Sequence, residues 1–232
     1  HDDQHGTAIV VLAALLNALI IVKKKKKKIK IVINGAGSAG QAILYLLKKA
    51  GFSSKKIIIL DSKGIISKKR IDLDFYKQKI AKITNKNSLI GELKDAIKQT
   101  DVFIGVSIKD ILTKEMIDSM NIDPIVFAMA NPNPEISYKE IKKTKIAVFG
   151  TGRSDYPNQI NNILVFPGFF RGLLDARIKK ITEKMKIDAA YAIANLISKS
   201  KLNANYIIPN PFDKRVAKAI ANAVKNANNI NL

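Results

Sequence analysis

Short runs of β-branched residues alternate along this chain with segments whose apolar residues follow a helical spacing. Six strands are expected, at residues 30–33, 56–60, 101–106, 124–129, 145–149 and 163–166. Helices are expected at residues 41–50, 89–99, 113–119, 138–142, 173–195 and 214–226. Strands that alternate with helices predict an α/β fold with a doubly wound parallel sheet, followed by a helical C-terminal segment.

The most hydrophobic stretch, residues 8–22, precedes the first expected strand. It is interrupted only by Asn17, and a run of lysines at residues 23–28 follows it. The stretch is shorter than the roughly 20 residues that a bilayer span needs, and its charged end is the wrong one for a signal peptide. We therefore expect a buried helix and no membrane association. The lysines are expected to be solvated, with a polyanion contact as the alternative.

The composition is that of an ordinary globular protein, with 47% apolar and 25% charged residues among 232. The net charge is +21, but only five of the 40 cationic residues are arginine. Because proteins that read phosphates favour the planar fork of arginine, we expect no nucleic-acid partner. Cysteine is absent, which excludes disulfides and cysteine-ligated metal sites.

A glycine motif, Gly35-x-Gly37-x-x-Gly40, lies between the first expected strand and the next helix. Gly35 permits a tight turn, Gly37 lets the backbone approach a diphosphate, and Gly40 lets the helix pack closely on the sheet. The helix is expected to begin at about Ser38, so that its free N–H groups face the phosphates. This context predicts a Rossmann-like site for NAD or NADP.

An acidic residue ends the second expected strand. Asp61 lies 21 residues after Gly40, where a carboxylate can accept a hydrogen bond from a ribose 2′-hydroxyl group and so favour NAD. Four cations just beyond it could instead bind the 2′-phosphate of NADP: Lys63, Lys68, Lys69 and Arg70. The choice between the two dinucleotides stays open.

These elements divide the chain into two parts. We expect an NAD(P)-binding domain with a leading helix at residues 1–161. A mainly helical segment at residues 162–232 is expected to pack back on the substrate side. After Gly168 the longest strand pattern spans only residues 206–208.

The chain opens with the sequence HDDQHGTA, which places two acids before a helix. Such acids stabilise a helix N-terminus, but their oxygens also suit a hard cation such as Mg²⁺ or Mn²⁺. The spacing alone favours capping. His1 and His5 are the only histidines and give a weak metal signal, so a histidine-based dehydrogenase mechanism is not expected.

Two asparagine-rich segments follow expected strands, ANPNPE at residues 130–135 and GTGRSDYPNQINN at 150–162. Asparagine, proline and glycine are typical of turns. In open α/β sheets, however, ligands bind outside the carboxyl ends of the strands. Neutral amides there can hold a carboxylate, a hydroxyl or a carboxamide group without adding charge.

Together these segments resemble the malic enzymes of bacterial type. The resemblance is carried by HDDQHGTA at 1–8, GAGSAG at 35–40, FAMANPNPEI at 127–136, GTGRSDYPNQINN at 150–162, FPGFFRGLLDARIKKI at 166–181 and IIPNPFDKRVAKAIANAV at 207–224. It spans essentially the whole chain, and long motifs in the same order are specific.

The resemblance implies roles for particular residues. Asp3 would be one of three carboxylate ligands of a catalytic Mg²⁺ or Mn²⁺, with Asp2 adjacent. Asn131 corresponds to an asparagine near the nicotinamide and the substrate, and Asn162 to one that binds malate. The diphosphate turn would consist of Gly35, Ala36, Gly37, Ser38, Ala39 and Gly40.

The implied reaction is oxidative decarboxylation of (S)-malate to pyruvate and CO₂ with reduction of NAD⁺ or NADP⁺. In the family, a tyrosine and a lysine that transfer protons, and two further metal carboxylates, precede the HDDQHG segment. Since the chain begins at His1, we expect a cofactor-binding part that is inactive alone and that needs the missing N-terminal half as its partner. A homo-oligomer and a cytoplasmic location are also expected.

Two other classes of protein are alternatives. Another Rossmann-fold dehydrogenase, such as an amino-acid or shikimate dehydrogenase, explains the glycine motif but not the segments HDDQHGTA and GTGRSDYPNQINN. A non-catalytic module that binds dinucleotides or nucleic acid is suggested by the charge of +21. Salt-dependent binding to any polyanion without dinucleotide binding would indicate the second alternative.

Overall fold

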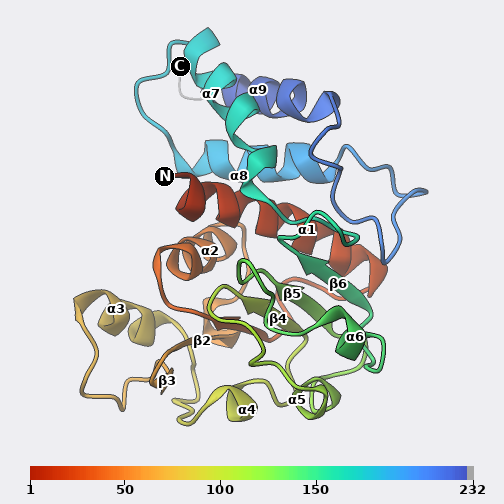
Figure 1. Cartoon of the computed structure of the whole chain (residues 1–232). Helices are drawn as coiled ribbons and strands as arrows, with labels where there is room; N and C mark the ends of the chain where they lie inside the picture. The colour runs from red at the N-terminus through yellow and green to blue at the C-terminus, as the bar shows by residue number, and fades with distance from the viewer. Residues whose placement is uncertain (229–232) are drawn as a thin grey trace.

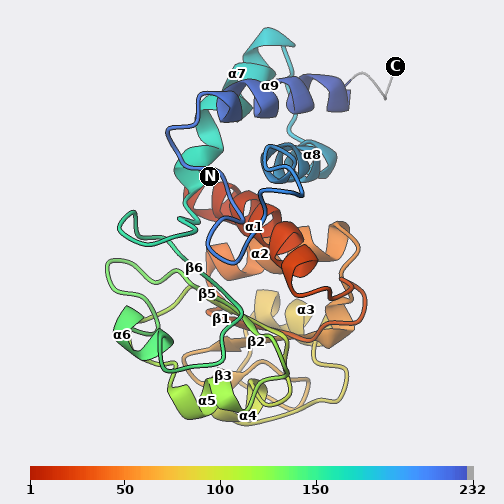
Figure 2. The same ribbon diagram turned by 90° about the vertical axis from the view of Figure 1, so that its right-hand side faces the viewer.

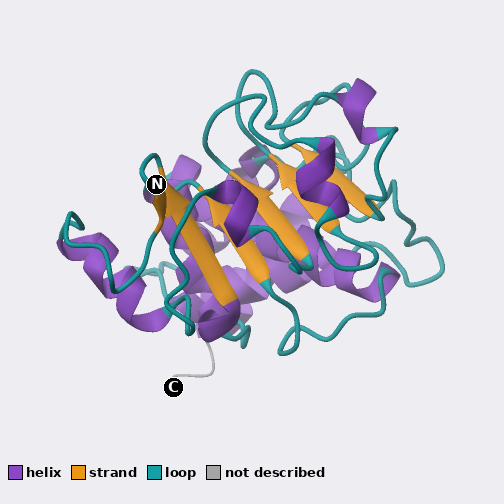
Figure 3. Cartoon of the chain, turned by 90° about the horizontal axis from the view of Figure 1, so that it is seen from below, coloured by secondary structure: helices purple, strands orange, loops and turns teal. Residues whose placement is uncertain are grey.

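The computed structural model describes residues 1–228, and a six-stranded sheet forms its framework (Figure 3). In the spatial order β3-β2-β1-β4-β5-β6, the strands are Gly64–Ile65, Ile57–Asp61, Ile31–Asn34, Val102–Gly105, Ile125–Ala128 and Val148–Thr151. The five longer strands are parallel, and β3 pairs antiparallel with β2. The predicted α/β fold is confirmed, with the Rossmann strand order. The sheet is mixed rather than wholly parallel because of the two-residue edge strand, which has no sequence signal.

Two apolar clusters lie on opposite faces of the sheet. Successive residues of a strand belong alternately to one and to the other, because neighbouring side chains of a strand point to opposite faces. Val32, Phe103 and Val126 belong to the cluster shared with α4 (Leu93–Ala96) and α5 (Lys114–Asp118). The alternate residues of the same strands belong to the larger cluster on the other face. The strands are therefore buried on both sides, which accounts for their nearly continuous apolar sequences.

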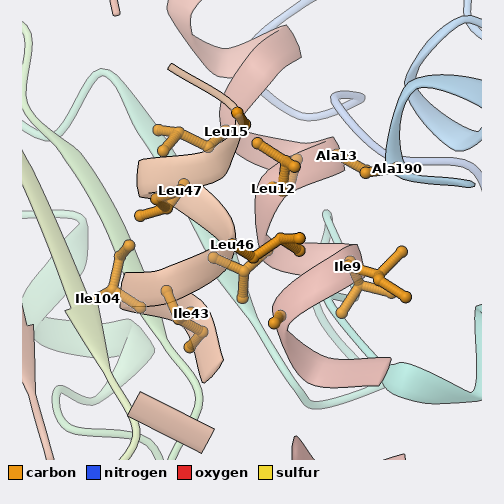
Figure 4. Close-up of a cluster of buried hydrophobic side chains, with 14 of the residues drawn as sticks. Ile9, Leu12, Ala13, Leu15, Ile43, Leu46, Leu47, Ile104 and Ala190 are labelled. Atoms are coloured by element: carbon orange, nitrogen blue, oxygen red, sulfur yellow. The ribbon is translucent and has the colours of Figure 1, made fainter. Parts of the chain in front are cut away.

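Three helices are stacked on the larger cluster. α2 (Ser38–Lys49) lies nearest the sheet, α1 (Thr7–Ile21) packs on α2, and α8 (Glu183–Ala194) packs on α1 (Figures 1 and 2). Figure 4 shows the side chains between these layers, labelled as Ile9, Leu12, Ala13 and Leu15 of α1, Ile43, Leu46 and Leu47 of α2, Ile104 of β4 and Ala190 of α8. α1 is apolar all round because it has protein on both sides.

Two further helices form the layer outside α8. α7 (Phe166–Asp175) packs against α9 (Arg215–Asn228), and α9 packs against α8 (Figure 1). A Cβ atom on Gly168 or Gly172 would lie closer than 3.0 Å to backbone atoms of α9, so these glycines let α7 and α9 approach closely. The expected helical C-terminal segment is present, while its boundary at residues 161/162 stays a prediction.

The remaining described elements are short. They are the π-helical turn η1 (Asp2–Gly6), the 3₁₀ turns η2 (Ser54–Lys56) and η3 (Asn162–Leu164), and the helices α3 (Phe75–Ile83) and α6 (Tyr138–Ile141).

The apolar N-terminal segment is buried as predicted. By length and composition Asp2–Ile21 could cross a membrane, but 67% of its most hydrophobic window is buried within the protein. Its one polar interruption has a structural role. Asn17 is buried, and its Nδ2 donates to the carbonyl oxygens of Ala194 at 3.0 Å and Ile207 at 2.9 Å. Asn17 therefore ties α1 to the C-terminal segment.

The lysine run is only partly solvated. Lys24 Nζ donates to Asp101 Oδ1 at 3.0 Å, and Lys26 Nζ donates to the Ala50 carbonyl oxygen at 2.8 Å. The exposed members of the run are Lys23, Lys25, Lys27 and Lys28. Two of the six lysines thus join the end of α1 to neighbouring elements, and the polyanion alternative stays a prediction.

Two sequence predictions are wrong in the C-terminal segment. Residues 163–166 form no strand: η3 and the start of α7 occupy them, and Pro167 in the first turn suits a helix start. The helix expected at 173–195 is interrupted between α7 and α8. Arg177 there has a φ of +49°, and the Thr182 side chain begins the second helix by accepting from the Met185 N–H at 3.3 Å.

Two more differences lie on the β2–β4 connection. The helix expected at 89–99 shortens to the single turn of α4, whose cap is formed by Glu92. No helix is expected from the sequence at α3, since this segment has no strong apolar periodicity. Its first two residues, Phe75 and Tyr76, are exposed in the structure. Its clearest signal is its cap: the Asp74 side chain accepts from the Lys77 N–H at 2.9 Å.

Candidate dinucleotide and substrate site

The order of the strands creates a crevice between β1 and β4. The chain leaves β1 towards β2 on one side and later returns on the other side as β4. Open α/β sheets bind ligands at such a switch point, outside the carboxyl ends of the strands. The two ends are joined by a backbone hydrogen bond from the Val106 N–H to the Asn34 carbonyl oxygen at 2.9 Å.

The three glycines of the motif differ in what they permit. Gly35 has a φ of +121°, and a Cβ atom there would lie 2.7 Å from the Val106 carbonyl oxygen. At Gly40 a Cβ atom would collide with the backbone of Gly35, so this glycine lets α2 pack against the turn. Gly37 has open space, with nothing within 4 Å of the Cβ position. The structure thus explains the outer glycines by packing and leaves Gly37 facing free volume.

The first turn of α2 faces the same volume. α2 begins at Ser38, as predicted, and within the described chain no side chain caps it. The first N–H groups of a helix have no partner inside the helix and carry the positive end of its dipole. This turn is therefore suited to bind a diphosphate.

A cavity of about 480 Å³ opens beside the glycine turn. Its lining residues come from the ends of β1, β2 and β4 and from α3 and α4: Asn34, Gly35, Ala36, Gly37, Asp61, Ser62, Lys77, Leu93, Ser107, Ile108 and Ile111. The predicted turn residues and Asp61 are thus brought to one cavity, although they lie far apart in sequence.

Asp61 is held by two cations. Arg70 NH1 lies 2.7 Å from Asp61 Oδ1, Lys77 Nζ lies 2.8 Å from Oδ2, and the carboxylate is only 7% exposed. Burial alone would raise the pKa of Asp61, but the hydrogen bonds from Arg70 and Lys77 outweigh it and hold the pKa below its usual value. The carboxylate is therefore ionised at neutral pH.

The cations expected near a 2′-phosphate have different positions. Arg70 is engaged with Asp61 and with Asp72, and Lys63 Nζ lies 3.2 Å from Asp72. Lys68 and Lys69 are exposed. Lys77 lines the cavity itself. The structure therefore places an acid and a cation side by side at this end.

A second cavity, of about 330 Å³, lies beyond the glycine turn. It is lined by residues from the N-terminal segment, the end of β4 and both asparagine-rich segments: Asp3, Thr7, Ala39, Val106, Ser107, Met129, Ala130, Asn131, Gly152, Arg153, Ile160, Asn161 and Asn162. Asp3, Asn131 and Asn162 therefore share one cavity. Ser107 lines both cavities, so they adjoin.

The asparagines of the second segment have different roles. Asn162 Nδ2 donates to Asp3 Oδ1 at 3.4 Å, whereas Asn161 Oδ1 caps η3 by accepting from the Ile163 N–H at 3.0 Å. Asn158 is buried and bonds only to backbone, including the Phe149 carbonyl oxygen at 2.7 Å. Asn162 is the member directed at another candidate site residue.

The sequence model that describes the family "Malic enzyme, NAD binding domain" matches residues 4–228 of this chain. The chain belongs to this family. The resemblance predicted from the motifs is confirmed, and the family match decides against an amino-acid or shikimate dehydrogenase.

Relatives in the family are longer than this chain. The bifunctional malic/malolactic enzyme of Bacillus subtilis is 54% identical over 228 residues, and the NAD-dependent malic enzyme of Geobacillus stearothermophilus is 50% identical over 227. Both matches cover 98% of this chain, but 55% and 47% of those proteins. The chain thus spans about half the length of the curated relatives it matches.

The fold of the family is also that of this chain. The crystal structure of the NAD-dependent malic enzyme from Thermotoga maritima superposes with a TM-score of 0.92 at 42% identity, covering 97% of this chain and 59% of that one. The family includes NAD-dependent and NADP-dependent enzymes, so membership leaves the choice of dinucleotide open.

The carboxylates of Asp2 and Asp3 at the N-terminus are the type of ligand that a hard divalent cation prefers. Asp2 Oδ1 is buried without a hydrogen-bond partner, and burial raises the pKa of this carboxyl. The Asp3 carboxylate is 80% exposed. A Cβ atom on Gly6 would collide with Asp2 Oδ1, so the glycine makes room for it. In residues 1–228 no group of three or more such ligands is gathered.

Of the two histidines, His5 is engaged elsewhere and His1 lies at the surface beside Asp3. His5 Nδ1 lies 3.3 Å from Lys186 Nζ, in a separate cavity that includes Glu183. Burial, followed by the nearby Lys186 charge, lowers the pKa of His5. His1 Nδ1 is 4.0 Å from Asp3 Oδ2 and is largely exposed.

Several residues at the site are missing from the sequence prediction, and four of them are charged or contact the proposed ligand path. Lys77 and Ser107 line the first cavity, Arg153 lines the second, and Glu135 is buried behind it. The only sequence signal for Arg153 is its place within an asparagine-rich segment. The others lie outside recognisable motifs or inside a segment typical of turns, so only the packed structure reveals their position.

Proposed function

We propose that this domain binds NAD⁺ or NADP⁺ for a malic enzyme that converts (S)-malate to pyruvate and CO₂. The observation that carries the proposal is the continuity of the two cavities through Ser107, with the glycine turn at one end and the asparagines at the other. A dinucleotide along this path would have its adenosine beside Asp61 and its nicotinamide beside Asn131.

The cofactor end follows from the geometry of the turn. Residues 35–40 and the free N–H groups of α2 would bind the diphosphate, and Gly37 would leave room for it. Asp61 would accept a hydrogen bond from the adenosine ribose, while Lys77 would add a positive charge beside it. NAD is favoured by the first contact and NADP by the second.

The substrate end follows from the polar lining of the second cavity. Asn162 would donate to malate, Asn131 would orient the nicotinamide and the substrate, and Arg153 would supply a cation near a malate carboxylate. Asp3 would hold Mg²⁺ or Mn²⁺ together with ligands from the rest of the enzyme. When bound, the dinucleotide accepts a hydride and the divalent cation acts as a Lewis acid.

Proton transfer is assigned to the tyrosine and lysine that the family resemblance implies. The charged side chains that line the second cavity, within residues 1–228, are Asp3 and Arg153. The first is assigned to the metal, and the second does not lose its proton at neutral pH. The proposed reaction thus depends on a second half of the enzyme, as the length of the relatives supports.

Replacement of Asn162 tests the substrate assignment. In an enzyme assembled from this domain and the remaining half of a malic enzyme, Asn162→Ala should raise the KM for malate about 10- to 100-fold, since a hydrogen bond to a charged group is lost. The affinity for the dinucleotide should change little. Steady-state kinetics and cofactor titration give the two values.

Asn133→Ala is the matched control, because Asn133 is an exposed asparagine outside both cavities. It should leave both values unchanged. Equal losses for malate and dinucleotide in Asn162→Ala would show that this asparagine only maintains the turn.

A further inference from the structure

Glu135 is a buried acid without a cationic partner in the described part of the chain. Its exposure is 0%, and no lysine, arginine or histidine among residues 1–228 pairs with it. Burial raises the pKa of this carboxyl. The other buried acid, Asp101, has Lys24 as its partner. A carboxylate buried without a cation is costly unless hydrogen bonds satisfy it.

Backbone N–H groups from two loops satisfy Glu135. The Ser107 N–H donates to Oε1 at 3.2 Å, and the Ala130 N–H donates to Oε2 at 3.0 Å. Both oxygens therefore act as acceptors. A glutamine at this position would have to present its NH₂ group to one of the two N–H donors, so a carboxyl group, with oxygen at both positions, suits the arrangement better.

β4 is adapted to the carboxylate. A Cβ atom on Gly105, the last residue of β4, would lie closer than 3.0 Å to the Cδ, Oε1 and Cγ atoms of Glu135. A glycine at the end of this strand thus makes room for the acid. The main chain is joined at the same place, because the Leu112 N–H donates to the Glu135 carbonyl oxygen at 2.9 Å.

The two bonded loops carry the inner wall of the site. Ser107 lines both cavities, and its Oγ accepts from Asn34 Nδ2 at 2.5 Å. Ala130 precedes Asn131, and both line the second cavity. One carboxylate therefore connects the ends of β4 and β5, and through Ser107 the end of β1.

We propose that Glu135 is a positioning residue, which fixes Ser107 and Asn131 for the nicotinamide half of the dinucleotide. The assignment rests on the proposed cofactor site. It differs from a general role in folding because the nicotinamide half of the ligand should depend on it more than the adenosine half. The adenosine half would lie against the glycine turn and Asp61, with which Glu135 forms no hydrogen bond among the described residues.

Binding of a whole dinucleotide and of ADP separates the two roles. In titration calorimetry of the 232-residue chain, Glu135→Gln should weaken binding of NAD⁺ or NADP⁺, whichever the wild type binds more tightly, by about tenfold. The affinity for ADP should change by no more than about twofold. Glu115→Gln, at an exposed position on α5, is the matched control and should leave both affinities unchanged.

A second variant displaces the same carboxylate without removing it. Gly105→Ala places a methyl group against Glu135 and should give the same pattern, so it carries the test if Glu135→Gln does not fold. Equal weakening of dinucleotide and ADP in a folded variant, or no weakening of either, would overturn the positioning role. If the wild-type chain binds ADP but binds neither dinucleotide more tightly than ADP, the positioning role is overturned as well. A wild-type chain that binds neither ligand would overturn the proposed function itself.

Discussion

Gly35, Gly37 and Gly40 have the same side chain for three different reasons. Gly35 needs a positive φ, Gly40 needs the space taken by the Gly35 backbone, and Gly37 faces open volume. The sequence motif predicts all three roles because each depends on local geometry. Glu135 shows the limit of such reasoning, since its partner Ser107 meets it only after β4 and β5 have paired. A glutamate inside a turn-like segment gives no signal of burial.

At the same scale, we expect Asp61 to set the balance between the two dinucleotides. Asp61→Asn keeps the shape of the side chain but leaves Arg70 and Lys77 without its charge. We expect the ratio of NADP⁺ to NAD⁺ affinity to rise about tenfold, because a 2′-phosphate would gain unopposed cations. Titration calorimetry with both dinucleotides measures the ratio. Asp72→Asn, which also removes a partner of Arg70 but lies outside the cavity lining, is the control. An unchanged ratio in Asp61→Asn would exclude this role.

Among the elements, the core strands and α2 are predictable from sequence, whereas the elements around them are less so. β-branched runs bounded by turns define β1, β2, β4, β5 and β6, because burial on both faces gives them a strong signal. The run at 163–166 gives the same signal but forms η3 and the start of α7, where packing against α9 prevails over local propensity. β3 is too short, and α3 too exposed, for a periodic pattern.

The contact between α1 and the C-terminal segment includes one buried amide, Asn17. Asn17→Leu would remove the side-chain donor of both carbonyl oxygens, and Ala194 would keep only the longer bond from the Ile197 N–H at 3.4 Å. We expect the free energy of unfolding to fall by about 1–3 kcal/mol. Chemical denaturation measures it. Asn222→Leu, at an exposed position of α9, should change it by less than about 0.5 kcal/mol. If the two variants are equally stable, Asn17 does not hold these elements together.

The end of α1 is joined to the start of β4 by Lys24 and Asp101. Lys24→Gln should lower the free energy of unfolding by about 1–3 kcal/mol, because the buried carboxylate loses a charged donor. Lys25→Gln, at the exposed neighbouring position, should have almost no effect. Equal effects of the two substitutions would mean that the whole lysine run is merely solvated.

The pH dependence of the same variant follows from Asp101. Burial alone would raise the pKa of Asp101, but hydrogen bonds from the Lys30 N–H and Lys24 outweigh it and keep the pKa below the ordinary 3.8. The folded state therefore releases this proton more readily than the unfolded state. The stabilisation is complete above about pH 3.8 and is lost as the pH falls through the lowered pKa. The difference between wild type and Lys24→Gln should shrink over that range.

For the whole molecule, we propose a dinucleotide-binding domain whose crevice continues into an amide-lined cavity that would hold malate. The net charge is +21, and some of the lysines form ion pairs within the protein, Lys24 with Asp101 and Lys77 with Asp61. The family match and the length of the relatives support a function within a larger malic enzyme. In this proposal, the switch point between β1 and β4 holds the dinucleotide.

Titration of the wild-type chain and its Gly37→Val variant with NAD⁺ and NADP⁺ tests that claim most directly. Because the Cβ position of Gly37 is open, valine should fit without unfolding the sheet while filling the space that the diphosphate needs. Circular dichroism and the melting temperature report the fold. We expect saturable binding of at least one dinucleotide by the wild type and its loss in a folded Gly37→Val variant. Unchanged affinity in that folded variant would contradict the proposal.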